Sequence, residues 1–176
     1  MKNQNVSFVV KSALVAALYV ALTLGLSFLS YQAIQFRVSE VMVLLAFVDR
    51  RYSYGLLAGC FIANLLGPFG LVDAIFGTIA SAFVFVMIYI TRRSLGNNTK
   101  SLLISSLWAS VSALIIAFEI VFFFKASESF WFWTAMVAIG QFTVVTLGGF
   151  PIFRWIIGRP DLMAKLSFDR VITPER

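Results

Sequence analysis

Charged and amide side chains interrupt the otherwise apolar stretches of this chain at a few positions. These positions are Arg37, Glu40, Asn64, Asp73, Glu119 and Gln141. An ionisable or hydrogen-bonding group inside a lipid bilayer costs free energy, so its presence there marks a functional site. Carboxylates accept hydrogen bonds, whereas amides both donate and accept them, so together they can hold a polar ligand. This set is therefore the candidate ligand-binding site.

Some members of the set also have a purely structural interpretation. Asp73 follows the turn sequence Gly67–Gly70 and can act as a helix-start residue that complements the helix dipole. Arg37 and Glu40 stand three positions apart and can pair with each other. Glu119 has no cation three or four residues away on its own helix, so a ligand role is the stronger interpretation there.

The residue types that are missing exclude several functions. With no histidine and one cysteine, Cys60, the chain cannot form a conventional zinc or haem site or a Ser-His-Asp arrangement. It has no glycine-rich loop followed by Lys-Ser or Lys-Thr, so the usual ATP site is missing as well. We therefore expect a binding or translocating protein that is not an enzyme, holds no cofactor, and receives its energy from other subunits.

The composition predicts an all-α membrane protein. Hydrophobic residues make up 60% of the chain, charged residues 12%, and the mean hydropathy is +0.92. Soluble domains carry about a quarter charged residues. We expect one membrane domain over residues 1–176, built as a bundle of six transmembrane helices followed by a basic tail at 158–176. The expected helices are residues 6–29, 38–48, 54–66, 71–90, 102–124 and 130–157.

Basic residues predict the orientation of this bundle. Twelve of the fourteen Lys and Arg residues fall on one side of the six-helix arrangement, and only Arg37 and Lys125 fall on the other. By the positive-inside tendency both termini are cytoplasmic, and the candidate site lies toward the external side. The net charge of +6 is thus a topology signal, and we expect no nucleic-acid partner. The aromatic run Phe130–Trp133 is interpreted as an interfacial belt.

Two helices carry stripes of small residues, which allow close helix packing in lipid. One stripe is Gly55, Gly59, Ala63 and Gly67, for which an internal packing seam is the favoured interpretation. The other is Ala13, Ala17 and Ala21, for which internal packing and docking of another membrane subunit are both open.

Several of these elements together resemble the QueT family. The similar segments are Ile34–Glu40, Gly59–Leu66 with Asn64, Gly70–Asp73, Phe76–Gly77 and Ala138–Gln141. Members of this family are substrate-binding (S) components of energy-coupling-factor (ECF) transporters, assigned to queuosine precursors. Gln141 stands where the family pattern often has glutamate, so this position supplies an amide here.

The resemblance implies a multi-pass protein of the bacterial cell membrane that captures a 7-deazaguanine such as preQ1 from outside. It also implies docking of the Ala13/Ala17/Ala21 stripe on a transmembrane coupling subunit that carries two ATPase subunits, which would use the ATP. For the ligand, we expect Glu119 or Glu40 at the guanine edge and Asp73 at the cationic arm. Asn64 and Gln141 would bind polar atoms between them, and Arg37 would orient Glu40. An S component for another vitamin, such as folate or riboflavin, and a ligand-independent membrane scaffold remain alternatives.

Overall fold

The computed structural model describes residues 2–32 and 34–168, with side chains from Val6 onward, and every regular element in these ranges is helical. Two of the elements are not α-helices: η1 is a 3₁₀ helix and η2 is a π-helix. In chain order they are α1 (Lys2–Gly25), α2 (Ser27–Ser30), η1 (Val38–Leu44), α3 (Leu45–Val48), α4 (Tyr52–Leu65), α5 (Gly70–Leu95), α6 (Thr99–Phe122), α7 (Phe130–Gln141), η2 (Phe142–Gly149), α8 (Phe150–Ile157) and α9 (Pro160–Leu166).

Each of the six expected ranges is helical, but not all of them are long enough to span a membrane. Four segments are long and apolar enough to do so, namely Val6–Gly25, Gly70–Leu95, Thr99–Phe122 and Phe130–Ile157. The other two, Val38–Val48 and Tyr52–Leu65, are shorter apolar helices. At 1.5 Å per residue the latter covers only about 21 Å of a hydrocarbon layer of about 30 Å. The count of six spans and the orientation of the termini therefore stay predictions.

The helix expected at 71–90 is longer than its hydropathy indicates. It continues to Leu95, so Arg92 and Arg93 lie in its last turns and not in the connection to α6. Gly96, with φ of 77°, ends the helix in a conformation that glycine adopts without strain. Basic side chains in a last turn also complement the negative end of the helix dipole, which accounts for the longer helix.

The segment expected to be a basic tail, 158–176, contains a further helix, α9. This helix begins with Pro160 and carries Asp161 in its first turn, both favourable at a helix start. Arg170 and Arg176, two of the cationic residues on which the orientation rests, lie outside the described residues.

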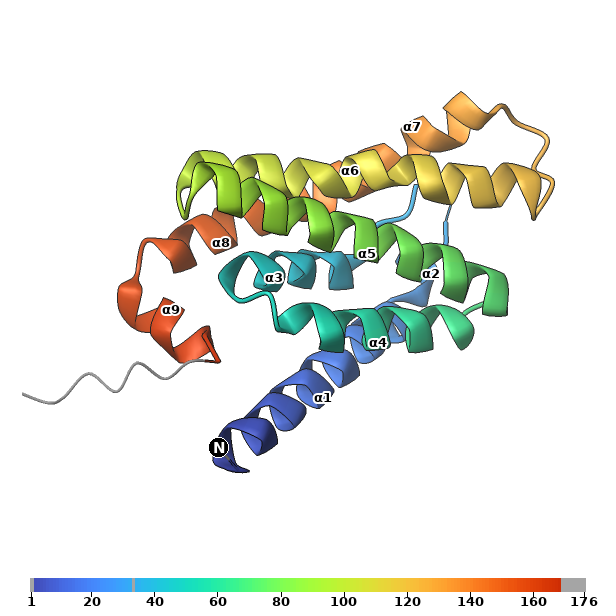
Figure 1. Ribbon diagram of the computed structural model, residues 1–176. Helices are drawn as coiled ribbons and strands as arrows, with labels where there is room; N and C mark the ends of the chain where they lie inside the picture. Colours follow the sequence, from blue (N-terminus) through green and yellow to red (C-terminus); the bar gives the residue numbers. More distant parts are fainter. Residues whose placement is uncertain (1, 33, 169–176) are drawn as a thin grey trace, which may run out of the picture.

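The helices pack as a bundle in which α5 and α6 run side by side, and α4 lies between α5 and α1 (Figure 1). The glycines of the stripe on α4 allow a close approach to α1. A Cβ atom at Gly55 would lie 2.4 Å from the backbone oxygen of Ser12, and one at Gly59 would lie 2.9 Å from that of Ala16. These glycines therefore form a packing seam with α1, as the sequence predicts. The other stripe, Ala13/Ala17/Ala21, is exposed on α1.

Apolar side chains occupy both the interior and the outer surface of the bundle. Tyr19 and Phe47 are among the largest fully buried side chains of the main core. Leu14, Val86 and Leu147 are each more than half exposed, and many other large apolar side chains share this environment. A surface of this kind is compatible with lipid and not with water.

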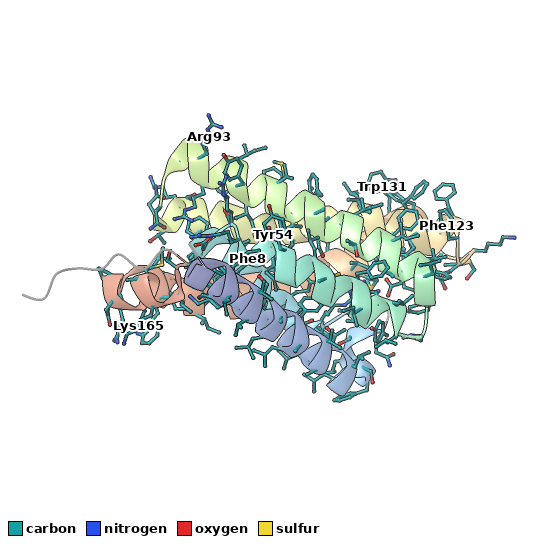
Figure 2. All side chains as sticks on the ribbon, turned by 60° about the horizontal axis from the view of Figure 1, so that its bottom comes forward. Phe8, Tyr54, Arg93, Phe123, Trp131 and Lys165 are labelled. Atoms are coloured by element: carbon teal, nitrogen blue, oxygen red, sulfur yellow. The ribbon has the colours of Figure 1, made fainter. Side chains whose placement is uncertain are left out.

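The two ends of the bundle differ in chemistry. Arg93 and Lys165 lie at one end, and Phe123 and Trp131 lie at the other (Figure 2). We call these the basic end and the aromatic end.

Asp49 holds the segment after α9 against the basic end through a hydrogen bond. Its carboxylate accepts hydrogen bonds from the guanidinium of Arg51 at 2.8 Å and from the backbone N–H of Phe168 at 3.0 Å. Burial alone would raise the pKa of Asp49, but these hydrogen bonds lower it to about 2. Two further contacts hold the same segment: Lys11 donates to Ser167 O at 3.0 Å, and Tyr52 donates to Leu166 O at 2.6 Å.

Candidate ligand-binding site

A cavity of about 220 Å³ lies between α5, α6 and α7 and is also lined by residues that follow α2. Two acids of the candidate set, Asp73 and Glu119, line it. Aromatic side chains form much of the rest of the wall, namely Tyr31, Phe69, Phe124 and Trp133. The cavity thus combines a small number of polar groups with flat apolar surfaces, which is the usual composition of a small-molecule site.

Asp73 is placed in the cavity by the turn that precedes α5. Gly70 adopts a φ of 64°, which favours glycine, and starts the helix so that Asp73 falls in its first turn. The carboxylate of Asp73 lies 4.0 Å from the guanidinium of Arg37, and both side chains are buried. The guanidinium of Arg37 also lies over the ring of Tyr31, 5.4 Å from its centroid. The sequence suggested Glu40 as the partner of Arg37, but the acid within ion-pair distance is Asp73, so the pairing with Glu40 is not formed.

Asn64 connects α4 to the start of α5. Its amide nitrogen donates to the backbone oxygen of Asp73 at 3.2 Å. This contact depends on Gly77, because a Cβ atom there would lie 2.1 Å from the amide nitrogen of Asn64. Asn64 lines neither the main cavity nor the smaller void described below. It therefore positions Asp73 from outside the cavity.

Glu119 is the acid in the cavity that has no partner among the residues that the structure describes. It lies near the end of α6 with 1% of its surface exposed. Neither carboxylate oxygen has a hydrogen-bond partner among residues 6–32 and 34–168. A buried carboxylate without a partner is costly, and a bound ligand that donates hydrogen bonds removes this cost.

Glu40 and Gln141 line a separate, smaller void of about 10 Å³, which Arg37 also lines. The void shares the wall residues Gln35 and Ile116 with the main cavity, so the two spaces are neighbours. Glu40 accepts a hydrogen bond from the Tyr19 hydroxyl at 2.5 Å.

Gln141 ends α7 where the π-helical segment η2 begins. Its amide oxygen is buried and has no partner within the part of the chain that the structure describes. Segments of π-helix occur frequently at functional sites. The candidate set is thus divided, with Asp73 and Glu119 in the main cavity, Arg37, Glu40 and Gln141 around the void, and Asn64 behind Asp73.

Trp133 is a site residue that the sequence did not identify, because the run Phe130–Trp133 was interpreted as a belt. Trp131 and Phe132 are exposed, in agreement with that interpretation. Trp133 instead lines the cavity, and its indole N–H is buried without a partner among the described residues. Helical spacing is the signal that could have found it, since Trp133 and Gln141 are eight residues apart on one face.

Phe69 and Gln32 are further lining residues that were not identified as part of the site. Both lie in connections between helices. Hydropathy and helical periodicity do not show which way a side chain points in such a connection. Phe69 contacts Phe124 with ring centroids 5.0 Å apart and Tyr31 at 6.2 Å. These rings form an aromatic wall on the side of the aromatic end.

Comparison with known proteins places the chain in a family. The QueT transporter family model matches residues 9–157. A curated relative, "Queuosine precursor transporter QueT" of Lactococcus lactis subsp. cremoris (strain MG1363), is 34% identical over 159 residues, which is 85% of this chain and 92% of the relative. No solved structure matches. A transporter family agrees with the expectation that the chain is not an enzyme, and with a multi-pass protein of the bacterial cell membrane. The chain therefore belongs to the QueT transporter family.

Proposed function

We propose that this chain is the substrate-binding membrane subunit of an ECF-type importer, and that it binds a queuosine precursor of the 7-deazaguanine class. The relative from Lactococcus lactis carries the name of a queuosine precursor transporter, which supports the substrate class. The observation that carries the proposal is the buried carboxylate of Glu119, which has no partner in the described part of the chain and lies in a cavity that Asp73 also lines.

The chemistry of the cavity suits a flat base with a cationic arm. A carboxylate can accept both the ring N–H and the exocyclic amine of a guanine edge as a bidentate pair. Glu119 accepts no hydrogen bond from any described residue and is available for this edge, whereas Glu40 is already hydrogen-bonded to Tyr19 and lies outside the main cavity. The aminomethyl arm of 7-aminomethyl-7-deazaguanine carries a positive charge, and we assign it to Asp73.

The aromatic wall and the buried indole complete this assignment. Tyr31 and Phe69 provide faces on which a planar ring system can stack. The N–H of Trp133 can donate to a ring carbonyl oxygen. A volume of about 220 Å³ accommodates one bicyclic base, and is small for folate or riboflavin, which carry long side chains. Cavity size therefore favours the 7-deazaguanine over the vitamin alternatives.

We further propose the topology and partners of the importer. With both termini cytoplasmic, the basic end faces the cytoplasm and the aromatic end, next to the cavity, faces outward. Ala13, Ala17 and Ala21 are exposed on α1 and leave room for a helix of a transmembrane coupling subunit. Two ATPase subunits bound to that subunit would supply the energy, because this chain has no ATP site of its own.

The experiment that tests the proposal compares two glutamates. Glu119→Gln keeps the size of the side chain but removes the charge, and we expect it to weaken binding of 7-aminomethyl-7-deazaguanine by about 10- to 100-fold. Glu128→Gln is the matched control, because Glu128 is exposed and does not line the cavity. Isothermal titration of the detergent-purified proteins measures both. Equal affinities for Glu119→Gln and the parent would remove Glu119 from the site.

A further inference from the structure

The basic end carries a recess of about 540 Å³ whose wall includes the four arginines Arg50, Arg51, Arg92 and Arg93. Asp49 also lines it, but its carboxylate is bonded to Arg51 at 2.8 Å. With its pKa lowered to about 2, Asp49 is ionised at any working pH and offsets one of the four positive charges. The recess therefore keeps a strong positive charge and suits an anion.

Three of these arginines, Arg50, Arg92 and Arg93, are available to bind an anion from outside the chain. Arg92 is oriented by its hydrogen bond to the backbone oxygen of Val48 at 2.8 Å, which uses a donor without neutralising the charge. Arg50 lies over the ring of Tyr89, 6.0 Å from its centroid. Arg50 and Arg93 are both exposed, and neither forms an ion pair within residues 6–32 and 34–168. An arginine donates several N–H groups in one plane, which matches the oxygens of a phosphate.

An apolar groove of about 490 Å³ leads away from this recess between α4 and α5. Leu57 lines it on α4, and Ala82, Phe85 and Val86 line it on α5. It shares Tyr89 and two of the arginines with the recess, so the polar and apolar parts are continuous. From Tyr89 to Ala82 the groove follows α5 for about 10 Å toward the aromatic end.

We propose that this recess and groove bind an anionic phospholipid, with its phosphate on Arg50, Arg92 and Arg93 and one acyl chain along Leu57 and Val86. The choice of an anionic phospholipid follows from the positive charge of the recess and from the position of the groove beside it. The arginines are complementary to a phosphodiester, and the groove opens on the apolar outer surface that faces lipid. Basic pockets between transmembrane helices bind anionic head groups in the same way. The site lies at the end of the bundle opposite the aromatic end and is independent of the 7-deazaguanine site.

Native mass spectrometry of the full chain in detergent tests this proposal by titration with phosphatidylglycerol. Phosphatidylcholine with the same acyl chains is the neutral lipid control, and glycerol 3-phosphate is the head group without chains. We expect the parent to bind phosphatidylglycerol more tightly than either. The double variant Arg50→Gln/Arg93→Gln should bind it about 30-fold more weakly, which is about fivefold per arginine. Both side chains are exposed, so the variant should fold.

Arg154→Gln/Arg159→Gln is the matched control, because both residues are exposed cations of the C-terminal helices that do not line the recess. It should leave phosphatidylglycerol binding nearly unchanged. Val86→Trp fills the exposed groove and should weaken binding of the lipid but not of glycerol 3-phosphate. Equal losses in the two arginine pairs would overturn the proposal, because they would indicate diffuse charge attraction.

Two further results would also overturn it. If glycerol 3-phosphate binds as tightly as phosphatidylglycerol, the recess takes a free phosphate and the groove has no part in binding. If Arg50→Gln/Arg93→Gln keeps its lipid affinity but no longer assembles with a protein subunit, the recess is a protein contact. Binding of 7-aminomethyl-7-deazaguanine should be the same in parent and variant, which separates this inference from the proposed function.

Discussion

The guanidinium nitrogen Nη2 of Arg37 lies 4.0 Å from the carboxylate oxygen Oδ2 of Asp73, and both side chains are about 6% exposed. Arg37 precedes η1, whereas Asp73 lies in the first turn of α5, so the ion pair joins two separate elements of the bundle. It leaves Glu119 as the cavity carboxylate without a partner among the described residues. This difference between two neighbouring acids underlies the assignment of Glu119 to the guanine edge.

Removing one member of that ion pair should destabilise the protein. Arg37→Gln leaves the carboxylate of Asp73 buried without its cation, at a cost of about 3 kcal/mol. We expect a lower midpoint of thermal unfolding in detergent for Arg37→Gln. The double variant Arg37→Gln/Asp73→Asn should lose less stability than the sum of its single variants, because it leaves no uncompensated charge. Strictly additive losses would show that the two side chains do not interact.

A methyl group at Gly77 should disturb the site without touching the ligand. The added Cβ would lie 2.1 Å from the amide nitrogen of Asn64, so Gly77→Ala should displace Asn64 from Asp73 and cost about 1–3 kcal/mol. Thermal unfolding and ligand titration should both report the change. Gly148→Ala is the control, because its Cβ would meet no closer neighbour than Thr143 O at 3.6 Å. Comparable losses in the two variants would contradict the proposed role of Asn64.

Asp49 should make the stability of the basic end depend on pH in the acid range. Its pKa is lowered from 3.8 to about 2 by hydrogen bonds from Arg51 and from the Phe168 backbone, which outweigh the effect of burial. A carboxyl with a lowered pKa stabilises the folded state above its unfolded pKa, and this stabilisation disappears as the pH falls through the folded pKa. Parent and Asp49→Asn should therefore differ in thermal stability by a constant amount above about pH 5, and the difference should shrink as the pH falls from there toward about pH 2. A difference that grows with acid would contradict this.

The exposed stripe on α1 should matter for assembly but not for folding. Ala17→Leu enlarges a side chain on the exposed surface of α1, so the thermal stability of the isolated chain should stay the same. Co-purification with a transmembrane coupling subunit should fall, because the larger side chain keeps the helices apart. Ala135→Leu changes an exposed alanine on α7 and provides the control. Normal assembly of Ala17→Leu would exclude the stripe as the docking surface.

The long helices could be predicted because their signal is local. Runs of apolar residues define the spans from Gly70, Thr99 and Phe130, and hydropathy alone locates each of them. Their details could not be predicted in the same way. Residues 142–149 are mostly apolar, with Thr143 and Thr146 as the polar exceptions, and this pattern does not distinguish a π-helix from an α-helix. The 3₁₀ geometry of Val38–Leu44 likewise depends on packing, because η1 lies against α1 and η2.

The polar residues of the site could be identified from the cost of placing them in lipid, but their partners could not. Sequence spacing suggested Glu40 as the partner of Arg37, whereas the packing of α5 brings Asp73 within ion-pair distance. Trp133 was grouped with its exposed neighbours because position along the chain does not show which side of a helix faces a cavity. The partner of Arg37 and the position of Trp133 in the cavity thus depend on contacts between helices, which composition and periodicity do not show.

Titration of the purified parent protein with a panel of ligands tests directly whether the chain binds a 7-deazaguanine. The panel consists of 7-aminomethyl-7-deazaguanine, its 7-cyano analogue without the cationic arm, guanine, riboflavin and folate. We expect saturable binding of the aminomethyl compound, weaker binding of the cyano compound and guanine, and no binding of the two vitamins. Tighter binding of riboflavin or folate would indicate an S component for a different substrate. No saturable binding of any compound would contradict the proposed function and favour a membrane scaffold.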